Sequence, residues 1–213
     1  MQRIFLLIMV AICFATSVYA QEPNMSVYGR KGISISPKVS KFFKNLRYSD
    51  ELMLGVGLDS RSSFAVGDVA TVYHRFGDTA AVGIGTGLLA SRMLDNMYYF
   101  ASTDDVSRHY SMQVLLPLFF RCKVSPWRFG QWQPFGRFDV GGVVRLSEGY
   151  GGGLFFAPAL GTNLQTGKNL NLFFALSMHW MQAGYLFESY IGQPAEVVGS
   201  SATSLMLHAG IDF

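Results

Sequence analysis

Apolar and polar residues alternate along most of the chain after residue 50, and the end of the chain shows the pattern most clearly. Leu205, Leu207, Ala209 and Ile211 fall on one face of an extended segment that ends at Phe213, while the opposite face carries Ser204, His208, Gly210 and Asp212. Successive side chains of a β-strand point to opposite sides. The pattern therefore predicts a strand with lipid on one side and a polar interior on the other.

The same alternation predicts four further strands, over residues 110–121, 135–146, 154–165 and 170–181. In the last of these, Leu172, Phe174 and Leu176 alternate with polar positions such as Ser177 and His179. Three earlier stretches are less regular: 52–59, 66–76 and 80–89. The first and third place glycines on the presumed inner face, whereas the second has no clean apolar face because Asp68 and His74 share one side.

These segments define the fold class as all-β, an antiparallel up-and-down transmembrane β-barrel of about eight strands. In lipid every backbone polar group must be paired internally, so a spanning protein is helical or a closed barrel. No segment after the first twenty residues holds the 18 or so continuous apolar residues of a spanning helix. Ten strands are the alternative, with an extra pair formed around Tyr48-Ser49-Asp50.

The lengths of the connections support a barrel. Phe76–Thr79 and Thr166–Asn169 are short, whereas Ser91–His109 and Gln182–Thr203 are long. Outer-membrane barrels alternate short periplasmic turns with longer external loops. We therefore expect the short connections to face the periplasm and the long ones to form external loops.

The N-terminal segment predicts export. Residues 1–20 combine a charge at Arg3, an apolar run and a small residue at Ala20, which is typical of a signal peptide cleaved before Gln21. Residues 21–50 are predicted to be a periplasmic segment with a short basic amphipathic helix after Ser36 and Pro37. The barrel is then expected over residues 51–213, in the outer membrane of a Gram-negative cell.

Composition agrees with a membrane location. Half of the chain is hydrophobic and the mean hydropathy is +0.25, which is high for a soluble exported domain. The 17 basic and 14 acidic residues nearly balance, so nucleic acid is not an expected partner. Only Cys122 remains after the signal peptide, so no disulfide framework is expected.

With the strands in place, the chain resembles the small outer-membrane barrel proteins of Bacteroidetes, the porin-like or PorT-like families, and in architecture the outer membrane protein X type. The resemblance lies in Leu115-Leu116-Pro117-Leu118-Phe119-Phe120-Arg121, in Gln133-Pro134-Phe135-Gly136-Arg137-Phe138-Asp139-Val140-Gly141-Gly142, and in the terminal strand that ends at Phe213. It implies the fold and the location, and it identifies Phe213 with the signal that the barrel assembly machinery reads. It implies no reaction and no shared ligand.

The charged residues of the inner face are the first candidate site. A narrow lumen cannot hold unpaired charges, so these residues are expected to form a network of ion pairs that fills the barrel. An eight-stranded barrel is just wide enough for its own side chains. The predicted lumen network comprises Arg121, Arg137, Asp139, Arg145, His179, His208 and Asp212.

Catalysis, metal binding and cofactors are not expected. Ser177, His179 and Glu188 superficially suggest a hydrolytic triad, but the motif of the outer-membrane lipid A deacylases places serine two residues after histidine, where this chain has Met181. Residues i and i+2 of a strand also lie too far apart for a direct Ser–His hydrogen bond. The four histidines are scattered without the spacing of metal ligands.

The two long connections carry the remaining candidate surface, because both are rich in aromatic residues. Such patches are either interfacial anchors or contact sites for a partner. The candidate contact residues are Tyr98, Tyr99, Phe100, Tyr185, Phe187 and Tyr190. The leading hypothesis is a non-enzymatic barrel, structural or adhesive, with outer-membrane lipid, the assembly machinery and an extracellular protein or glycan as partners. The alternatives are a small channel for polar solutes and a lipid-modifying enzyme.

Overall fold

The computed structural model describes residues 46–213 apart from 101–102, 104, 148–151, 167–169 and 190–194. The predicted signal peptide and most of the predicted basic helix lie outside the described residues, but Leu46 and Arg47 of that helix begin a strand instead. Within the described ranges, no helix has the length and apolar character needed to cross a membrane.

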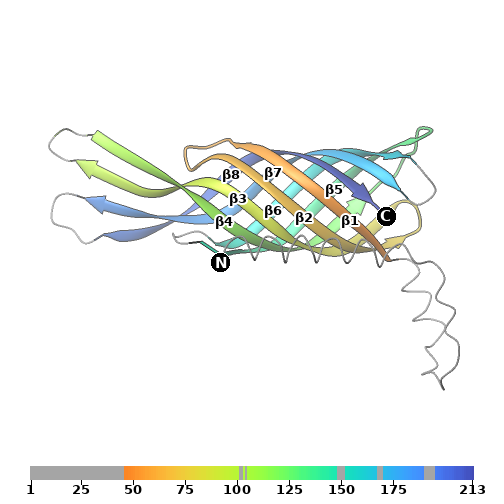
Figure 1. Cartoon of the computed structure of the whole chain (residues 1–213), viewed down its shortest axis with the longest axis horizontal. Helices are drawn as coiled ribbons and strands as arrows, with labels where there is room; N and C mark the ends of the chain where they lie inside the picture. The colour runs from red at the N-terminus through yellow and green to blue at the C-terminus, as the bar shows by residue number, and fades with distance from the viewer. Residues whose placement is uncertain (1–45, 101–102, 104, 148–151, 167–169, 190–194) are drawn as a thin grey trace, which may run out of the picture. The chain divides into compact units, whose positions relative to one another are not determined.

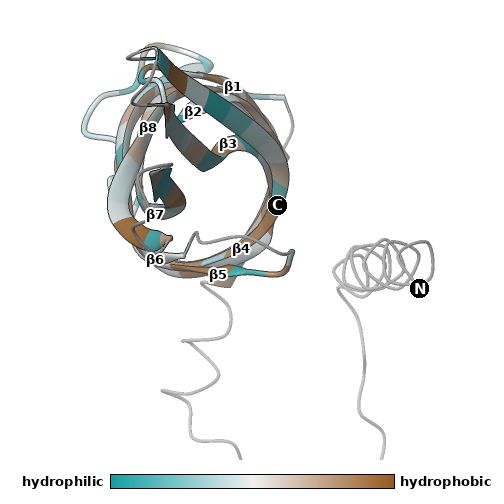
Figure 2. Cartoon of the chain, turned by 90° about the vertical axis from the view of Figure 1, so that its left-hand side faces the viewer, coloured by the Kyte–Doolittle hydropathy of each residue, from teal (hydrophilic) through white to brown (hydrophobic). Residues whose placement is uncertain are grey.

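Eight antiparallel strands form a closed barrel in which each strand pairs with its neighbours in the chain and β1 pairs with β8 (Figures 1 and 2). The prediction of eight strands is confirmed, and the ten-strand alternative is wrong because Tyr48 to Asp50 continue into the same strand as Leu52. The strands are β1 Leu46–Gly57, β2 Ser62–Phe76, β3 Ala80–Phe100, β4 Asp105–Val124, β5 Trp132–Arg145, β6 Gly153–Gln165, β7 Asn171–Ser189 and β8 Glu196–Asp212.

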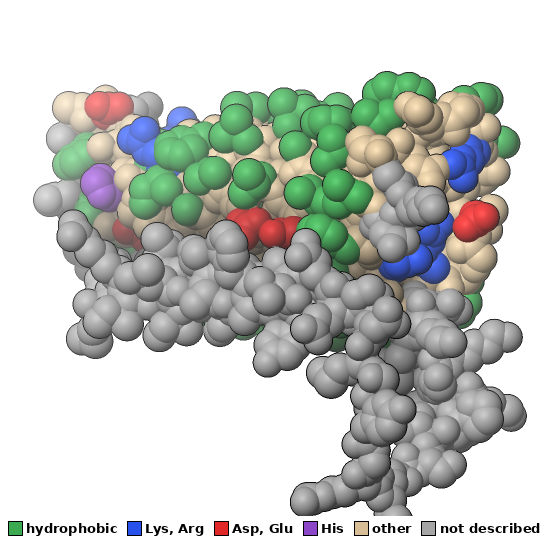
Figure 3. Space-filling model, turned by 45° about the vertical axis from the view of Figure 1, so that its right-hand side comes forward, with side chains coloured by type: hydrophobic (Ala, Val, Ile, Leu, Met, Phe, Trp, Pro, Cys, Tyr) green, Lys and Arg blue, Asp and Glu red, His purple; other side chains and the backbone are tan. Residues whose placement is uncertain are grey.

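The barrel wall is apolar outside and largely polar or tightly packed inside. Leu160 and Leu52 on the outer face are 75% and 66% exposed, whereas Ser177 and Asp139 on the inner face are 2% exposed. Apolar side chains cover much of the outer surface in Figure 3. An exposed apolar belt on a ring of strands with no free edge is the surface that a lipid bilayer requires.

Several strands are longer than the sequence predicts. β1 begins at Leu46, so it includes five residues that the sequence assigned to the segment before the barrel. The long loops predicted over 91–109 and 182–203 are wrong, because most of these residues extend β3, β4, β7 and β8. The aromatic residues that suggested a loop surface also favour strands, since they pack well on a pleated surface. Tyr190 lies outside the described residues.

These extensions form two hairpins, β3–β4 and β7–β8, which project beyond the rim of the barrel at one end (Figure 1). Asn96–Tyr99 of β3 pair in parallel with Leu186–Ser189 of β7, so the two hairpins are joined to each other. An irregularity between Leu94 and Asn96 in the β3–β4 pairing directly precedes this contact. Because a bulge bends its strand, it accounts for the approach of β3 to β7 across the barrel mouth.

Glycines of the inner face make room for aromatic rings in the lumen. A Cβ atom at Gly85 would lie 2.3 Å from the ring of Phe119, and one at Gly210 would lie 2.5 Å from the ring of Phe173. The predicted preference for small inward residues in the early strands therefore has a direct steric cause. At the opposite end from the hairpins, Gly77 has a φ of 65° in the short β2–β3 turn, a conformation that glycine adopts without strain.

Two carboxylates interrupt the apolar outer wall. Asp50 and Asp68 are both exposed on the outward face, where Asp68 pairs across the ladder with Leu52 and Asp50 with Ala70. Acidic side chains are visible among apolar ones in Figure 3. Charged groups on the lipid face of a barrel destabilise it, most strongly near the bilayer midplane. The irregular face that the sequence shows in 66–76 is thus real.

Replacing Asp68 by leucine is expected to stabilise the barrel by about 1 to 2 kcal/mol in lipid, because it removes a carboxylate from the apolar belt. Urea unfolding of the protein in bilayers, followed by the shift of the folded band on unboiled gels, measures the change. The matched control is Asp78→Leu in the β2–β3 turn, where the side chain is 91% exposed to water and no gain is expected. An unchanged or lower stability of Asp68→Leu would contradict this interpretation.

Candidate functional site: a charged layer across the lumen

Four buried charged side chains meet inside the barrel. They are Glu51 of β1, Arg121 of β4, and Arg137 and Asp139 of β5, and none is more than 5% exposed. Glu51 receives Arg121 Nη2 at 2.5 Å on Oε1 and Arg137 Nη1 at 2.6 Å on Oε2. Arg121 and Asp139 lie opposite each other in the β4–β5 ladder and form a bidentate pair, with both N–O distances 2.8 Å.

This layer is electrically balanced. Its two guanidinium groups meet two carboxylates, and Arg137 Nε also lies 3.4 Å from Asp139 Oδ2. Bidentate arginine–carboxylate pairs are among the strongest hydrogen-bonded ion pairs in proteins. Because desolvated charges are costly when one partner is missing, each of these four residues depends on the others.

His208 of β8 joins the layer through Arg137. Arg137 Nη2 lies 3.2 Å from His208 Nδ1, and His208 Nε2 lies 2.6 Å from Ser177 Oγ. His208 Nδ1 also lies 3.4 Å from Glu51 Oε2. The ring therefore accepts a hydrogen bond from Arg137 in one tautomer and faces Glu51 as a donor in the other. The second arrangement resembles a catalytic triad of Glu51, His208 and Ser177, but Ser177 is 2% exposed and both oxygens of Glu51 already receive arginine donors.

On the short-turn side of the charged layer lies a second ion pair. Lys123 Nζ donates to Asp212 Oδ2 and to Asn163 Oδ1, both at 2.9 Å. The same ammonium group lies 4.3 Å from the ring centroid of Phe135 and 5.2 Å from that of Phe173. The lysine is therefore held by a carboxylate, an amide and two aromatic faces.

On the hairpin side the lumen is filled by apolar side chains. Met53, Phe119, Phe155 and Met206 belong to one buried cluster. His179 packs beside it, with its ring centroid 5.2 Å from that of Phe155 and 5.5 Å from that of His208. Neither ring nitrogen of His179 has a hydrogen-bond partner among the described residues. The lumen thus contains an apolar layer stacked on a charged one.

The structure brings together four of the seven residues of the predicted network and separates the other three. Arg121, Arg137, Asp139 and His208 meet in the charged layer, whereas Asp212 pairs with Lys123 and His179 lies in the apolar layer. Arg145 lies near the hairpin end, where its Nε donates to the carbonyl oxygen of Ser147 at 2.9 Å. Arg145 and Arg137 are an even number of residues apart on β5, so both face the lumen, but they lie at different depths along the barrel axis.

Sequence reasoning missed Glu51 and Lys123. Both lie on the inner face by the same alternation that was used elsewhere: Glu51 shares the parity of Gly55, and Lys123 shares that of Arg121. Extending each predicted strand by two residues would have found them.

Comparisons with known proteins identify the fold of the chain but not its family. No family model matches, and no curated protein matches. Among solved structures, Neisserial surface protein A is similar with a TM-score of 0.54 and 8% identity, over 79% of this chain and 96% of that one. The outer membrane protein AlkL in lipid bilayers has a TM-score of 0.49 with 11% identity, over 79% and 88%. The outer membrane protease OmpT from Escherichia coli has a TM-score of 0.41 with 9% identity, over 86% and 99%.

The class of the protein follows from the likeness to Neisserial surface protein A and from the barrel itself: this chain has the fold of a small outer-membrane β-barrel.

Replacing Glu51 by glutamine is expected to lower the free energy of unfolding by about 3 to 5 kcal/mol, because Arg121 and Arg137 would lose a shared buried carboxylate. Urea unfolding followed by tryptophan fluorescence measures the effect. The control is Glu196→Gln at the exposed start of β8, which should leave the midpoint unchanged. Equal midpoints for wild type and Glu51→Gln would show that the layer does not stabilise the barrel.

Proposed function

We propose that this protein is a non-enzymatic outer-membrane barrel whose lumen is closed and whose joined hairpins bind an extracellular protein or glycan. The proposal includes an orientation in the membrane: the short turns face the periplasm and the hairpins face the outside of the cell, as in other outer-membrane barrels. A relation to the porin-like families of Bacteroidetes is also part of the proposal.

The observation that carries the binding role is the pairing of β3 with β7. It joins the two hairpins into one sheet beyond the barrel rim, with the strand order β4-β3-β7-β8. Tyr98, Tyr99 and Phe100 of β3 and Tyr185 and Phe187 of β7 lie half-buried on this platform. Aromatic residues are enriched at protein interfaces, and a paired sheet holds them with little loss of entropy on binding.

Closure of the lumen argues against the channel alternative. A pathway for polar solutes would have to pass both the apolar cluster around Phe119 and the ion pairs of Glu51 with Arg121 and Arg137. Displacing these groups would leave charges unpaired in a confined space.

The lipid-modifying alternative finds its best support in the 2.6 Å contact of Ser177 with His208. The carboxylate that would orient this histidine is Glu51, whose Oε2 lies 3.4 Å from His208 Nδ1, but the same oxygen receives Arg137 Nη1 at 2.6 Å and belongs to the charged layer. The serine is also 2% exposed inside the lumen.

The binding role is tested on bacteria that display the protein, with immobilised panels of extracellular proteins and glycans. The platform variant combines Tyr98→Ala, Tyr99→Ala and Phe187→Ala, and the matched control combines Trp127→Ala, Phe129→Ala and Trp132→Ala at the short-turn end. We expect the wild type and the control to bind at least one panel member and the platform variant to lose about 2 kcal/mol or more of that affinity.

Unboiled gels verify that all three proteins fold. Binding by the platform variant at wild-type strength, or no binding by the wild type above cells that lack the protein, would contradict the proposed role.

A further inference from the structure

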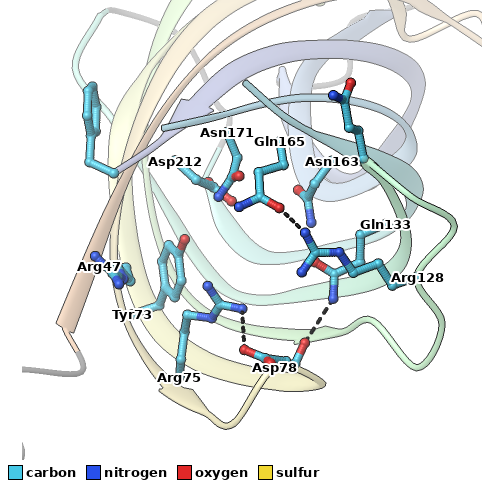
Figure 4. A pocket seen from close by; sticks show the side chains of 12 residues that line it. Arg47, Tyr73, Arg75, Asp78, Arg128, Gln133, Asn163, Gln165, Asn171 and Asp212 are labelled. Atoms are coloured by element: carbon cyan, nitrogen blue, oxygen red, sulfur yellow. Dashed lines mark hydrogen bonds and ion pairs between the residues drawn. The ribbon is translucent and has the colours of Figure 1, made fainter. Parts of the chain in front are cut away.

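The short-turn end of the barrel contains an open polar pocket of about 210 Å³ (Figure 4). Its lining comes from six strands and from the turns between them, so it lies across the mouth rather than on one wall. Figure 4 shows the side chains of Arg47, Arg75 and Arg128 entering from different parts of the rim. Tyr73 and Asp212 complete the deeper part of the lining.

The three arginines differ in how they are paired. Arg75 lies 3.5 Å from Asp78 Oδ1, so its charge is partly matched. Arg128 contacts the side-chain oxygen of Gln165 and donates to the carbonyl oxygen of Gly130 at 3.1 Å. Within the described ranges, neither Arg47 nor Arg128 forms an ion pair with an Asp or Glu side chain. The charges of both guanidinium groups therefore lack a carboxylate partner there, and each group can bind an anion through the N–H groups that it does not use within the protein.

The acidic groups of the pocket limit the charge of that anion. Asp212 is neutralised by Lys123 at 2.9 Å, but Asp78 is 91% exposed and only one of its oxygens faces Arg75. A dianionic group such as phosphate brings two charges to one point near this carboxylate, whereas a carboxylate brings one charge and matches the bidentate fork of a single guanidinium group.

The rest of the lining favours amide groups in the ligand. Five carboxamide side chains surround the pocket, and a carboxamide has both a donor and an acceptor group. Gln133 Nε2, Asn163 Oδ1 and Gln165 Oε1 already take part in hydrogen bonds within the protein. Gln131 and Asn171 make no side-chain hydrogen bond with another described residue. Peptide groups present the same pair of functions, and their N–H groups can also donate to the free oxygen of Asp78. The five are Gln131, Gln133, Asn163, Gln165 and Asn171.

From this geometry we infer that the pocket is a binding site for a short acidic peptide that carries two separate carboxylates. Arg47 and Arg128 face the pocket from opposite sides of the mouth, so each holds one carboxylate, and the carboxamides with Asp78 hold the peptide groups (Figure 4). Asp212 of the lining is held by Lys123, which packs against the rings of Phe135 and Phe173 inside the lumen, so the ligand docks at the mouth and does not pass through. The site lies at the opposite end from the hairpins, and the inference goes beyond the function proposed above.

Isothermal titration of the purified full-length protein in detergent micelles tests the inference with three probes. The first is an acetylated Ala-Glu-Ala tripeptide with a free carboxyl terminus, the second is its uncharged Ala-Gln-Ala amide, and the third is inorganic phosphate. The variants are Arg47→Gln and Arg128→Gln. The matched control is Arg108→Gln, which removes an exposed guanidinium from the hairpin part of β4.

We expect the acidic tripeptide to bind saturably and both other probes to bind about tenfold more weakly or less. Each pocket variant should weaken the tripeptide about tenfold, as expected for the loss of one charge-assisted contact, while Arg108→Gln binds as the wild type does. Chemical-shift changes on adding the tripeptide should fall on the ends of β6 and β8.

Three results would overturn the inference: no binding of the tripeptide, equal binding of the uncharged peptide or of phosphate, or equal loss in Arg108→Gln. Unboiled gels separate unfolded variants from folded ones. If Arg128→Gln fails to fold, Arg128→Lys replaces it, because this variant keeps the positive charge. Arg128→Lys should still bind the tripeptide more weakly than the wild type does, because lysine lacks the bidentate fork. Since the pocket and the hairpins lie at opposite ends of the barrel, failure of this assay is independent of the proposed extracellular role.

Discussion

The carboxylate of Glu51 is the group on which the interior of this barrel depends. It is buried beside two arginines, with Arg121 at 2.5 Å and Arg137 at 2.6 Å. These contacts connect β1 with β4 and β5, which lie across the lumen from it. A buried charge tolerates little displacement from its partners, so the pairing both neutralises the charges in the lumen and restrains the width of the barrel. Asp139 completes the balance from within the β4–β5 ladder.

Around this layer, the order of side chains along the lumen explains how a protein can be polar inside and yet closed. Apolar residues such as Phe119 and Met206 pack on the hairpin side, and Lys123 with Asp212 lies on the short-turn side. The carboxylates of the polar layers are paired with basic side chains, and the inward glycines leave the space that the aromatic rings need. The two mouths differ in structure, with a joined sheet at one end and a polar pocket at the other.

The period-two pattern was sufficient to predict the fold class, the number of strands and the inward face of each regular strand, because a one-residue error would have turned apolar faces into the lumen. The pattern could not predict how deep each inward side chain lies along the barrel axis, because that depends on the register between strands. Arg145 therefore lies on the predicted inner face but outside the charged layer. Glu51 lies just outside the predicted strand, which begins at Leu52, whereas the strand in the structure begins at Leu46. The joined hairpins could not be predicted either, because the parallel β3–β7 contact connects residues far apart in the sequence. Aromatic content alone does not distinguish a strand from a loop.

The central claim is that these layers close the lumen, and the conductance of the purified protein in planar lipid bilayers tests it most directly. A general porin in the same bilayers serves as the positive control for insertion and recording. The structure predicts that the wild-type barrel inserts without producing stable unitary current steps at either polarity. Steady, ion-selective steps from the wild-type protein would contradict the account.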